Sequence, residues 1–219
     1  MGWSEYILAA VAFLATHSIP LRPAMRQPIE LRIGMPMFLM LYSALSIAAL
    51  GWLIIAAGRA PYIALWAWAP WQLWVPQVGM ALVCLIAALT LGRPNPFSFG
   101  GARNAEFNPA QPGLIGWMRH PLLVVLALWA GVHIVPNGDL AHVLMFGSFC
   151  LFALLGIVMI DRRRKRNMGA AWVTMRAQTT PWPRPRLSTN AIMRTAIGAA
   201  IYIVLIWAHP ALFGVYPFG

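Results

Sequence analysis

The stretch LAHVLMFGSFCLFALLGIVMI, residues 140–160, runs directly into the charged segment DRRRKR at 161–166. About 20 consecutive apolar residues in one helix are enough to cross the ~30 Å hydrocarbon core of a bilayer. Lys and Arg immediately after such a run mark the cytoplasmic side of the membrane. Residues 140–160 therefore predict a transmembrane helix whose C-terminal end faces the cytoplasm.

Five other apolar runs have a similar length, and Pro or Gly punctuates their ends. The runs lie near residues 4–20, 35–57, 72–91, 114–135 and 191–209, and the punctuating residues are Pro20, Pro36, Gly58, Gly92, Pro136 and Pro210. No internal repeat separates the chain into parts. The pattern predicts an all-α, polytopic transmembrane helical bundle with about six spans, forming a single integral membrane domain over residues 1–219.

The composition agrees with a membrane protein and argues against a soluble one. Hydrophobic residues make up 60% of the 219 and charged residues only 10%, whereas a soluble domain carries about 25% charged residues. The 16 Lys and Arg against 5 Asp and Glu leave a net charge of +11. These basic residues lie between apolar runs rather than on one hydrated face, so a nucleic-acid partner is not expected.

Cys84 and Cys150 each lie inside a run, which predicts free thiols.

The distribution of Lys and Arg along the chain predicts its orientation. The first, third and fifth connections between runs are rich in these residues, while the opposite side of the membrane carries only Arg59. The positive-inside rule then places the odd connections in the cytoplasm and both termini in the periplasm, for a multi-pass protein of the cell inner membrane. The basic residues of the odd connections are Arg22, Arg26 and Arg32, then Arg93 and Arg103, then Arg162, Arg163, Arg164, Lys165, Arg166, Arg176, Arg184 and Arg186.

Two connections are long. Residues 92–113 are rich in Pro and Gly, and a loop of this length is typical either of a functional segment or of a disordered linker. The segment 161–190 is expected to start as a helical extension from Asp161 to Lys165 and to end in a Pro-rich stretch at Pro181, Pro183 and Pro185. Its arginine run is interpreted as a topology anchor beside anionic lipid headgroups.

Residues Arg119 and His120 precede Pro121 in the fourth run. Proline disfavours a helical conformation in the residue before it and suits the first position of a helix. The helix is therefore expected to start at Pro121, with Arg119 and His120 at its cytoplasmic end. Backbone N–H groups beside an arginine suit an anion, such as a lipid phosphate, a nucleotide phosphate or a cofactor carboxylate. Extension of Arg119 to the lipid interface is the alternative.

Two further histidines, His17 and His133, lie within apolar runs, while His142 and His209 lie at run ends. An ionisable residue within a span is costly and suggests a functional site. Each of the two is either a metal ligand or a core residue with a hydrogen-bond partner. No HExxH motif, Cys/His metal cluster, phosphate-binding loop or nucleophile triad is present.

Several short motifs, in their order and spacing, resemble the NnrU family of membrane proteins, which are associated with bacterial denitrification. The resemblance covers most of the chain, from about residue 6 to Pro183. The family itself is similar to plant 15-cis-ζ-carotene isomerase, a haem b membrane enzyme. The motifs are His17-Ser18, Arg119-His120-Pro121, His133 followed by Asn137-Gly138-Asp139, and Asp161-Arg162-Arg163.

The resemblance implies haem b, with His17 and His133 at the positions of the two ligands attributed to the plant isomerase. Where that enzyme has a Cys three residues before the second histidine, this chain has Ala130. The predicted topology favours a different pair, because His120 and His17 lie at similar depth and 13 helical residues place His133 ~20 Å from His120. All three histidines are therefore candidate axial ligands.

The resemblance also implies a range of functions, none with identified catalytic residues. The first is a haem-dependent, redox-gated isomerase or a denitrification-linked factor, which would act on an apolar small molecule. A fainter similarity of the Arg119-His120-Pro121 element and of the basic stretch with Trp172 points to isoprenylcysteine-type methyltransferases and sterol reductases. Such an enzyme would hold a nucleotide cofactor at the cytoplasmic face. A non-catalytic membrane accessory protein is the third alternative.

Overall fold

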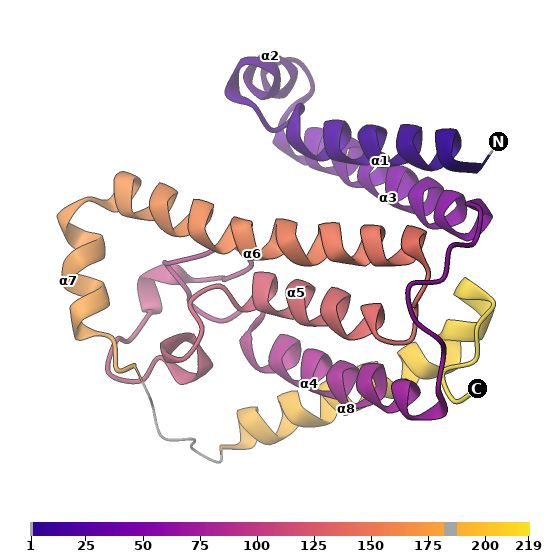
Figure 1. Cartoon of the computed structure of the whole chain (residues 1–219). Coiled ribbons are helices and arrows are strands. Elements are labelled where there is room, and N and C mark those ends of the chain that lie inside the picture. The colour runs from indigo at the N-terminus through magenta and orange to yellow at the C-terminus, as the bar shows by residue number, and fades with distance from the viewer. Residues whose placement is uncertain (1, 182–187) are drawn as a thin grey trace. The chain divides into compact units, whose positions relative to one another are not determined.

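The chain is predominantly helical in a computed structural model that describes residues 2–181 and 188–219 (Figure 1). Within those ranges there is no β-strand, and the all-α prediction is confirmed. Pro183, Pro185, Arg184 and Arg186, which entered the predictions above, lie outside the described residues. The α-helices are α1 (Gly2–Ser18), α2 (Pro23–Ile33), α3 (Met35–Arg59), α4 (Trp74–Thr90), α5 (Pro121–Ile134), α6 (Leu140–Met168), α7 (Ala170–Gln178) and α8 (Thr189–Phe213), and the short 3-10 helices are η1 (Pro70–Leu73), η2 (Asn104–Glu106) and η3 (Gly113–Gly116).

A multi-pass membrane protein is confirmed by the length and composition of these helices. In the described parts of the chain, four segments are long and apolar enough to cross a membrane: Met35–Arg59, Pro70–Thr90, Leu140–Met168 and Thr189–Phe213. Helices α1 and α2, which meet at a 69° bend, make a fifth if they form one span. The remaining predicted run, 114–135, is α-helical over the 14 residues of α5, which extend only ~21 Å. By length and composition the described helices therefore give four or five candidate spans, against the six predicted.

Five of the six predicted Pro and Gly boundaries lie within two residues of a helix end. Helix α1 ends at Ser18, before Pro20, but α8 continues through Pro210 to Phe213. Pro210 was expected to end this helix, and that prediction is wrong. The helix stops instead at Gly214, which adopts the left-handed conformation (φ 70°) and donates its N–H to the Pro210 carbonyl at 2.9 Å. Only glycine adopts this conformation at little cost.

The chain divides into two compact units, and the first comprises residues 2–67 and 138–145. Here α1 packs along α3. The Tyr6 hydroxyl donates to the Ala141 carbonyl at 3.1 Å, and the extended segment after α3 pairs with Gly138, whose carbonyl accepts from Leu65 N–H at 2.8 Å. A Cβ on Gly138 would lie 2.6 Å from the Trp66 carbonyl oxygen. A glycine is therefore required where the chain enters α6.

The second unit comprises residues 68–137 and 146–219, with α4 packed against both α5 and α8. Glycine permits the close approach on each side. A Cβ on Gly79 would overlap the side chain of Val132 in α5, and one on Gly198 in α8 would lie 3.1 Å from the Cys84 carbonyl oxygen. Cys84 and Cys150 are free thiols, as predicted.

The second unit brings four helix ends together. The Arg194 guanidinium, near the start of α8, donates to the carbonyls of Ala88 and Leu91 at the end of α4, at 2.8 and 3.0 Å. The start of α5 meets the C-terminal part of α6 through side chains described below. Helices α4 and α6 therefore run antiparallel to α5 and α8, as consecutive spans must.

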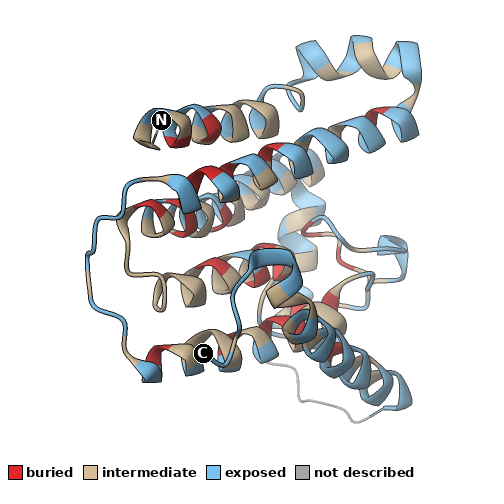
Figure 2. Ribbon diagram, turned by 90° about the vertical axis from the view of Figure 1, so that its right-hand side faces the viewer, coloured by how far each residue is buried: buried red, intermediate tan, exposed pale blue. Residues whose placement is uncertain are grey.

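Exposed apolar side chains cover the long helices, whose outward faces are pale blue in Figure 2. Ile47 of α3 is 70% exposed, and Trp207 of α8 is 82% exposed. Continuous exposed apolar surface of this kind is unfavourable in water, whereas lipid chains cover it without cost. The faces turned away from neighbouring helices are the lipid-facing surface.

Candidate functional site

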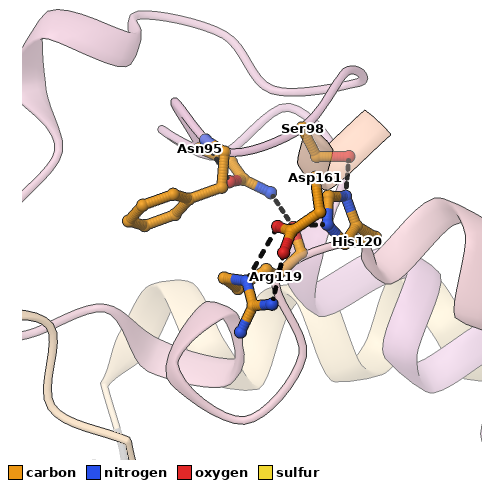
Figure 3. A network of polar contacts seen from close by, with 6 residues as sticks. Asn95, Ser98, Arg119, His120 and Asp161 are labelled. Carbon is orange, nitrogen blue, oxygen red and sulfur yellow. Dashed lines mark hydrogen bonds and ion pairs between the residues drawn. The ribbon is translucent and has the colours of Figure 1, made fainter. Parts of the chain in front are cut away.

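Helix α5 begins at Pro121, as the sequence predicts. His120 is the residue before the helix and has a non-helical backbone (φ −119°, ψ 61°), while its carbonyl accepts the first helical hydrogen bond from Val124 N–H at 3.0 Å. Proline at the first helical position has no N–H to satisfy, so the helix starts without an unpaired donor there. This geometry directs the side chains of Arg119 and His120 away from the helix axis toward α6 (Figure 3).

Arg119 binds a carboxylate of the protein itself. Its Nε and Nη2 atoms donate to the two oxygens of Asp161 on α6, at 3.2 and 2.9 Å. The two side chains are 27% and 25% exposed. A bidentate pair of this kind is among the stronger charge-assisted interactions. Arg119 was expected to face a lipid, nucleotide or cofactor anion, and the structure places Asp161 in that role.

His120 is 2% exposed and has a partner on each ring nitrogen. Nε2 lies 3.1 Å from Asp161 Oδ1, and Nδ1 lies 3.0 Å from the Ser98 hydroxyl. A carboxylate only accepts hydrogen bonds, so Nε2 carries the proton and Nδ1 accepts from Ser98. Burial lowers the pKa of His120, and the charges of Arg119 and Arg164 lower it further against the opposing effect of Asp161. His120 is therefore neutral at pH 7.

The protonated Nε2 donates to Asp161 and the lone pair of Nδ1 accepts from Ser98, so neither nitrogen is available to an iron atom. The pairing of His17 with His120, which depth in the membrane favoured, is therefore not supported by the hydrogen bonds of His120. Nor does the neutral imidazole provide a positive charge for a nucleotide phosphate. A Ser98–His120–Asp161 chain can in principle transfer a proton, but Ser98 is 1% exposed, and a substrate has no access to it.

The loop over residues 92–113 is an ordered part of this site. Asn95, Phe97 and Ser98 are all buried. The Asn95 side chain accepts from Phe97 N–H at 3.1 Å and donates to the Arg119 carbonyl at 2.9 Å. This part of the loop is therefore packed on the start of α5, and a functional role for residues 92–113 stays a prediction.

Arg164 completes the network from one turn further along α6. Its Nη2 donates to the Ser98 carbonyl at 2.7 Å. Two side chains of α6 thus bind two different segments. The Asp161 carboxylate binds the start of α5, and the Arg164 guanidinium binds the loop over residues 92–113. Asn95, Ser98, Arg119, His120, Asp161 and Arg164 together are called the mouth network below.

His17 and His133 share a different arrangement. The Nδ1 atom of each lies close to the carbonyl oxygen four residues earlier in its helix, at 2.9 Å for His17 and 2.7 Å for His133. Nδ1 therefore carries the proton, and Nε2 has no hydrogen bond to any described residue. An imidazole held through its other nitrogen in this way is the usual form of a metal-ligating histidine.

The ring of His133 lies against aromatic side chains of its own unit. The centroid distances are 5.3 Å to Phe146 and 5.7 Å to Trp129. Ala130, three residues before His133, is completely buried in α5. Among the residues described, no group of three or more His, Cys, Asp or Glu could hold a bare metal ion. The porphyrin supplies four of the ligands of a haem iron, so the protein needs to add only one or two axial ligands. The lack of a three-residue cluster in the described parts of the chain therefore argues against a bare metal ion and not against haem.

His142 has a role that the sequence did not predict. Its Nδ1 lies 2.8 Å from Asp139 Oδ2, and its backbone N–H donates to Asp139 Oδ1 at 3.2 Å. Asp139 thus caps the start of α6, and the Asn137-Gly138-Asp139 motif has a structural explanation. This hydrogen bond gives His142 a place in the cap of α6 that its position at a run end did not indicate.

Sequence reasoning missed most of the mouth network. Asn95 and Ser98 lie in a loop without periodicity, and Arg164 was interpreted as part of a lipid anchor. Asp161 carried a detectable signal, because the chain has only 5 Asp and Glu and this one lies beside a run of basic residues. A rare carboxylate at the end of a membrane helix suggests an internal partner.

Comparison with known proteins supports one assignment. The family model described as NnrU protein matches residues 5–217. No curated protein and no solved structure gives a significant match. The matched region includes nearly all of both units and every residue of the mouth network. The chain therefore belongs to the NnrU family.

Proposed function

We propose that this NnrU protein binds haem b through Nε2 of His133. The observation that carries the proposal is the arrangement of His133, whose Nδ1 is fixed by the Trp129 carbonyl at 2.7 Å. Its Nε2 has no hydrogen bond to any residue that the structure describes, and the rings of Trp129 and Phe146 lie beside the imidazole. One histidine is sufficient as the proximal ligand of a haem.

The chain's own residues would position this cofactor in a definite way. Donation from Nδ1 to a carbonyl orients the imidazole and raises the basicity of Nε2. The rings of Trp129 and Phe146 offer an apolar surface to a flat macrocycle and restrict water near the ligand. A bound haem would supply a redox-active iron, suited to a redox-gated isomerase acting on an apolar small molecule or to a denitrification-linked factor. A nucleotide-dependent enzyme has less support, because Asp161 already neutralises Arg119.

The experiment measures haem content and the visible spectrum of the full-length protein purified in detergent. The protein as expressed should show a Soret band, and His133→Gly should lose it or shift it. Added imidazole should restore the band in His133→Gly, because it replaces the missing ligand without a covalent link. His17→Gly shows whether that residue is also required.

His142→Ala is the control. The Nδ1 of His142 is held by the Asp139 carboxylate at 2.8 Å rather than by a carbonyl of its own helix. This variant should keep the spectrum of the parent. Unchanged haem content and an unchanged spectrum in His133→Gly would refute the proposal and leave the non-catalytic accessory role.

We also propose that the protein lies in the inner membrane with the mouth network on the cytoplasmic side and both termini in the periplasm. The support is that the end of α4, the start of α5 and the start of α8 gather with Arg119, Arg164 and Arg194. Basic residues are retained on the cytoplasmic side. A reporter fused after Gly219 should therefore be active only as a periplasmic reporter, and cytoplasmic activity would contradict this orientation.

A further inference from the structure

The basic run at the end of α6 is divided between two faces of the helix. Asp161 and Arg164 turn inward to the mouth network. Arg162, Lys165 and Arg166 turn outward and line a surface pocket together with Met159. Residues spaced by three, four or seven positions share one face of a helix, so these four form a continuous strip, which we call the outer face of α6.

The charges of the outer face are not neutralised within the described parts of the protein. Arg162, Lys165 and Arg166 are exposed, and none forms an ion pair with a described acidic side chain. Lys165 makes a cation–π contact instead, with its ammonium 5.7 Å from the centroid of the Trp172 ring on α7. Three adjacent cations without a counter-ion attract an anion.

The position of the outer face along α6 identifies the anion. Residues 140–160 extend ~31 Å, which matches the hydrocarbon thickness of a bilayer. Met159, 69% exposed, therefore lies at the edge of the acyl chains. Arg162 to Arg166 cover the next ~6 Å of the axis, which corresponds to the headgroup layer. An apolar residue followed by cations in this order matches a phospholipid, with its acyl chain beside Met159 and its phosphate beside the basic side chains.

We propose that the outer face of α6 is a binding site for an anionic phospholipid. The site differs from a diffuse topology anchor, because only the outward half of the basic run contributes to it. Arg163, two residues after Asp161, is also exposed but does not line the pocket, and Arg176 lies on α7 outside the strip. These two arginines supply a control of equal charge.

The experiment places the full-length protein in nanodiscs and compares two lipid compositions: phosphatidylcholine alone, and phosphatidylcholine with one fifth phosphatidylglycerol. Retained lipids are identified and counted by native mass spectrometry. The parent should retain phosphatidylglycerol in preference to phosphatidylcholine. The double variant Arg162→Gln/Arg166→Gln should lower that preference on the order of tenfold, because each cation near an anionic surface contributes several-fold to binding.

Two further variants decide the result. Arg163→Gln/Arg176→Gln, which removes the same charge, should keep the preference of the parent. Arg162→Lys/Arg166→Lys should also keep most of it, because the charges remain. Equal losses in the two Gln variants would show diffuse attraction of the whole basic segment and overturn the proposal. An unchanged preference for phosphatidylglycerol in both Gln variants would also overturn the proposal. So would a parent protein that retains free inorganic phosphate in place of the lipid.

Discussion

Replacement of Asp161 by asparagine should weaken the mouth network substantially. Asp161 accepts three hydrogen bonds, two from Arg119 and one from His120. Asparagine has one acceptor oxygen and no charge, so at least one donor loses its partner and the Arg119 guanidinium loses its counter-ion. Breaking a buried ion pair costs about 3–5 kcal/mol. Because both side chains are about a quarter exposed, solvent screens part of this, and we expect about 2–3 kcal/mol.

A loss of this size should lower the melting temperature by roughly 5–10 °C, given about 2–4 °C per kcal/mol for a chain of this length. Tryptophan fluorescence during heating of the protein in detergent measures the change. Glu106→Gln is the control, because Glu106 also pairs with an arginine, Arg103, but at 3.7 Å with the side chains 70% and 59% exposed. Exposed pairs contribute little, so this variant should melt within about 2 °C of the parent.

A double-mutant cycle isolates the pair from its surroundings. Arg119→Gln alone should also destabilise the protein, because it leaves the Asp161 carboxylate without its cation. The double variant Arg119→Gln/Asp161→Asn should be less destabilised than the sum of the two, with a coupling of about 1–3 kcal/mol. Additive effects, or an Asp161→Asn variant as stable as the parent, would refute the inference that this ion pair holds α5 to α6.

Two other predictions concern packing and pH. Gly79→Ala should destabilise the protein by about 1–3 kcal/mol, because the added methyl group overlaps Val132. Gly147→Ala, with open space around it, should be neutral or stabilising in the same melting assay. Equal effects of the two substitutions would contradict the close approach of α4 and α5. The free energy of unfolding should fall as the pH drops below about 6.5, because burial lowers the pKa of His120 in the folded state and the unfolded imidazole binds the proton first. His120→Gln should flatten this slope between pH 7 and 5, and an identical slope in both proteins would show that His120 is not its source.

The sequence by itself determined the elements that lipid imposes on any chain. Inside a bilayer every backbone N–H and C=O must be paired within the segment, so an apolar run of about 20 residues has to be a helix. The start of α5 at Pro121 was equally predictable, because proline restricts its neighbour locally. Where local rules were weak the predictions were wrong or silent: α8 passes Pro210, and the polar helix α2 within the first connection was not predicted.

Only the tertiary structure decided what the polar residues contact. The sequence indicated an anion near Arg119 and identified His120 as a possible ligand, but the partner, Asp161, is 42 residues away in the chain. Ser98, which occupies the other nitrogen of His120, lies in a loop with no regular pattern. Hydrogen bonds between distant segments depend on how helices pack, and packing depends on shape at sites such as Gly79 and Gly198 rather than on hydrophobic pattern. A single sequence therefore reveals which residues are costly to bury. The fold decides which of them bond to one another and which, like Nε2 of His133, have no hydrogen-bond partner among the residues that the structure describes.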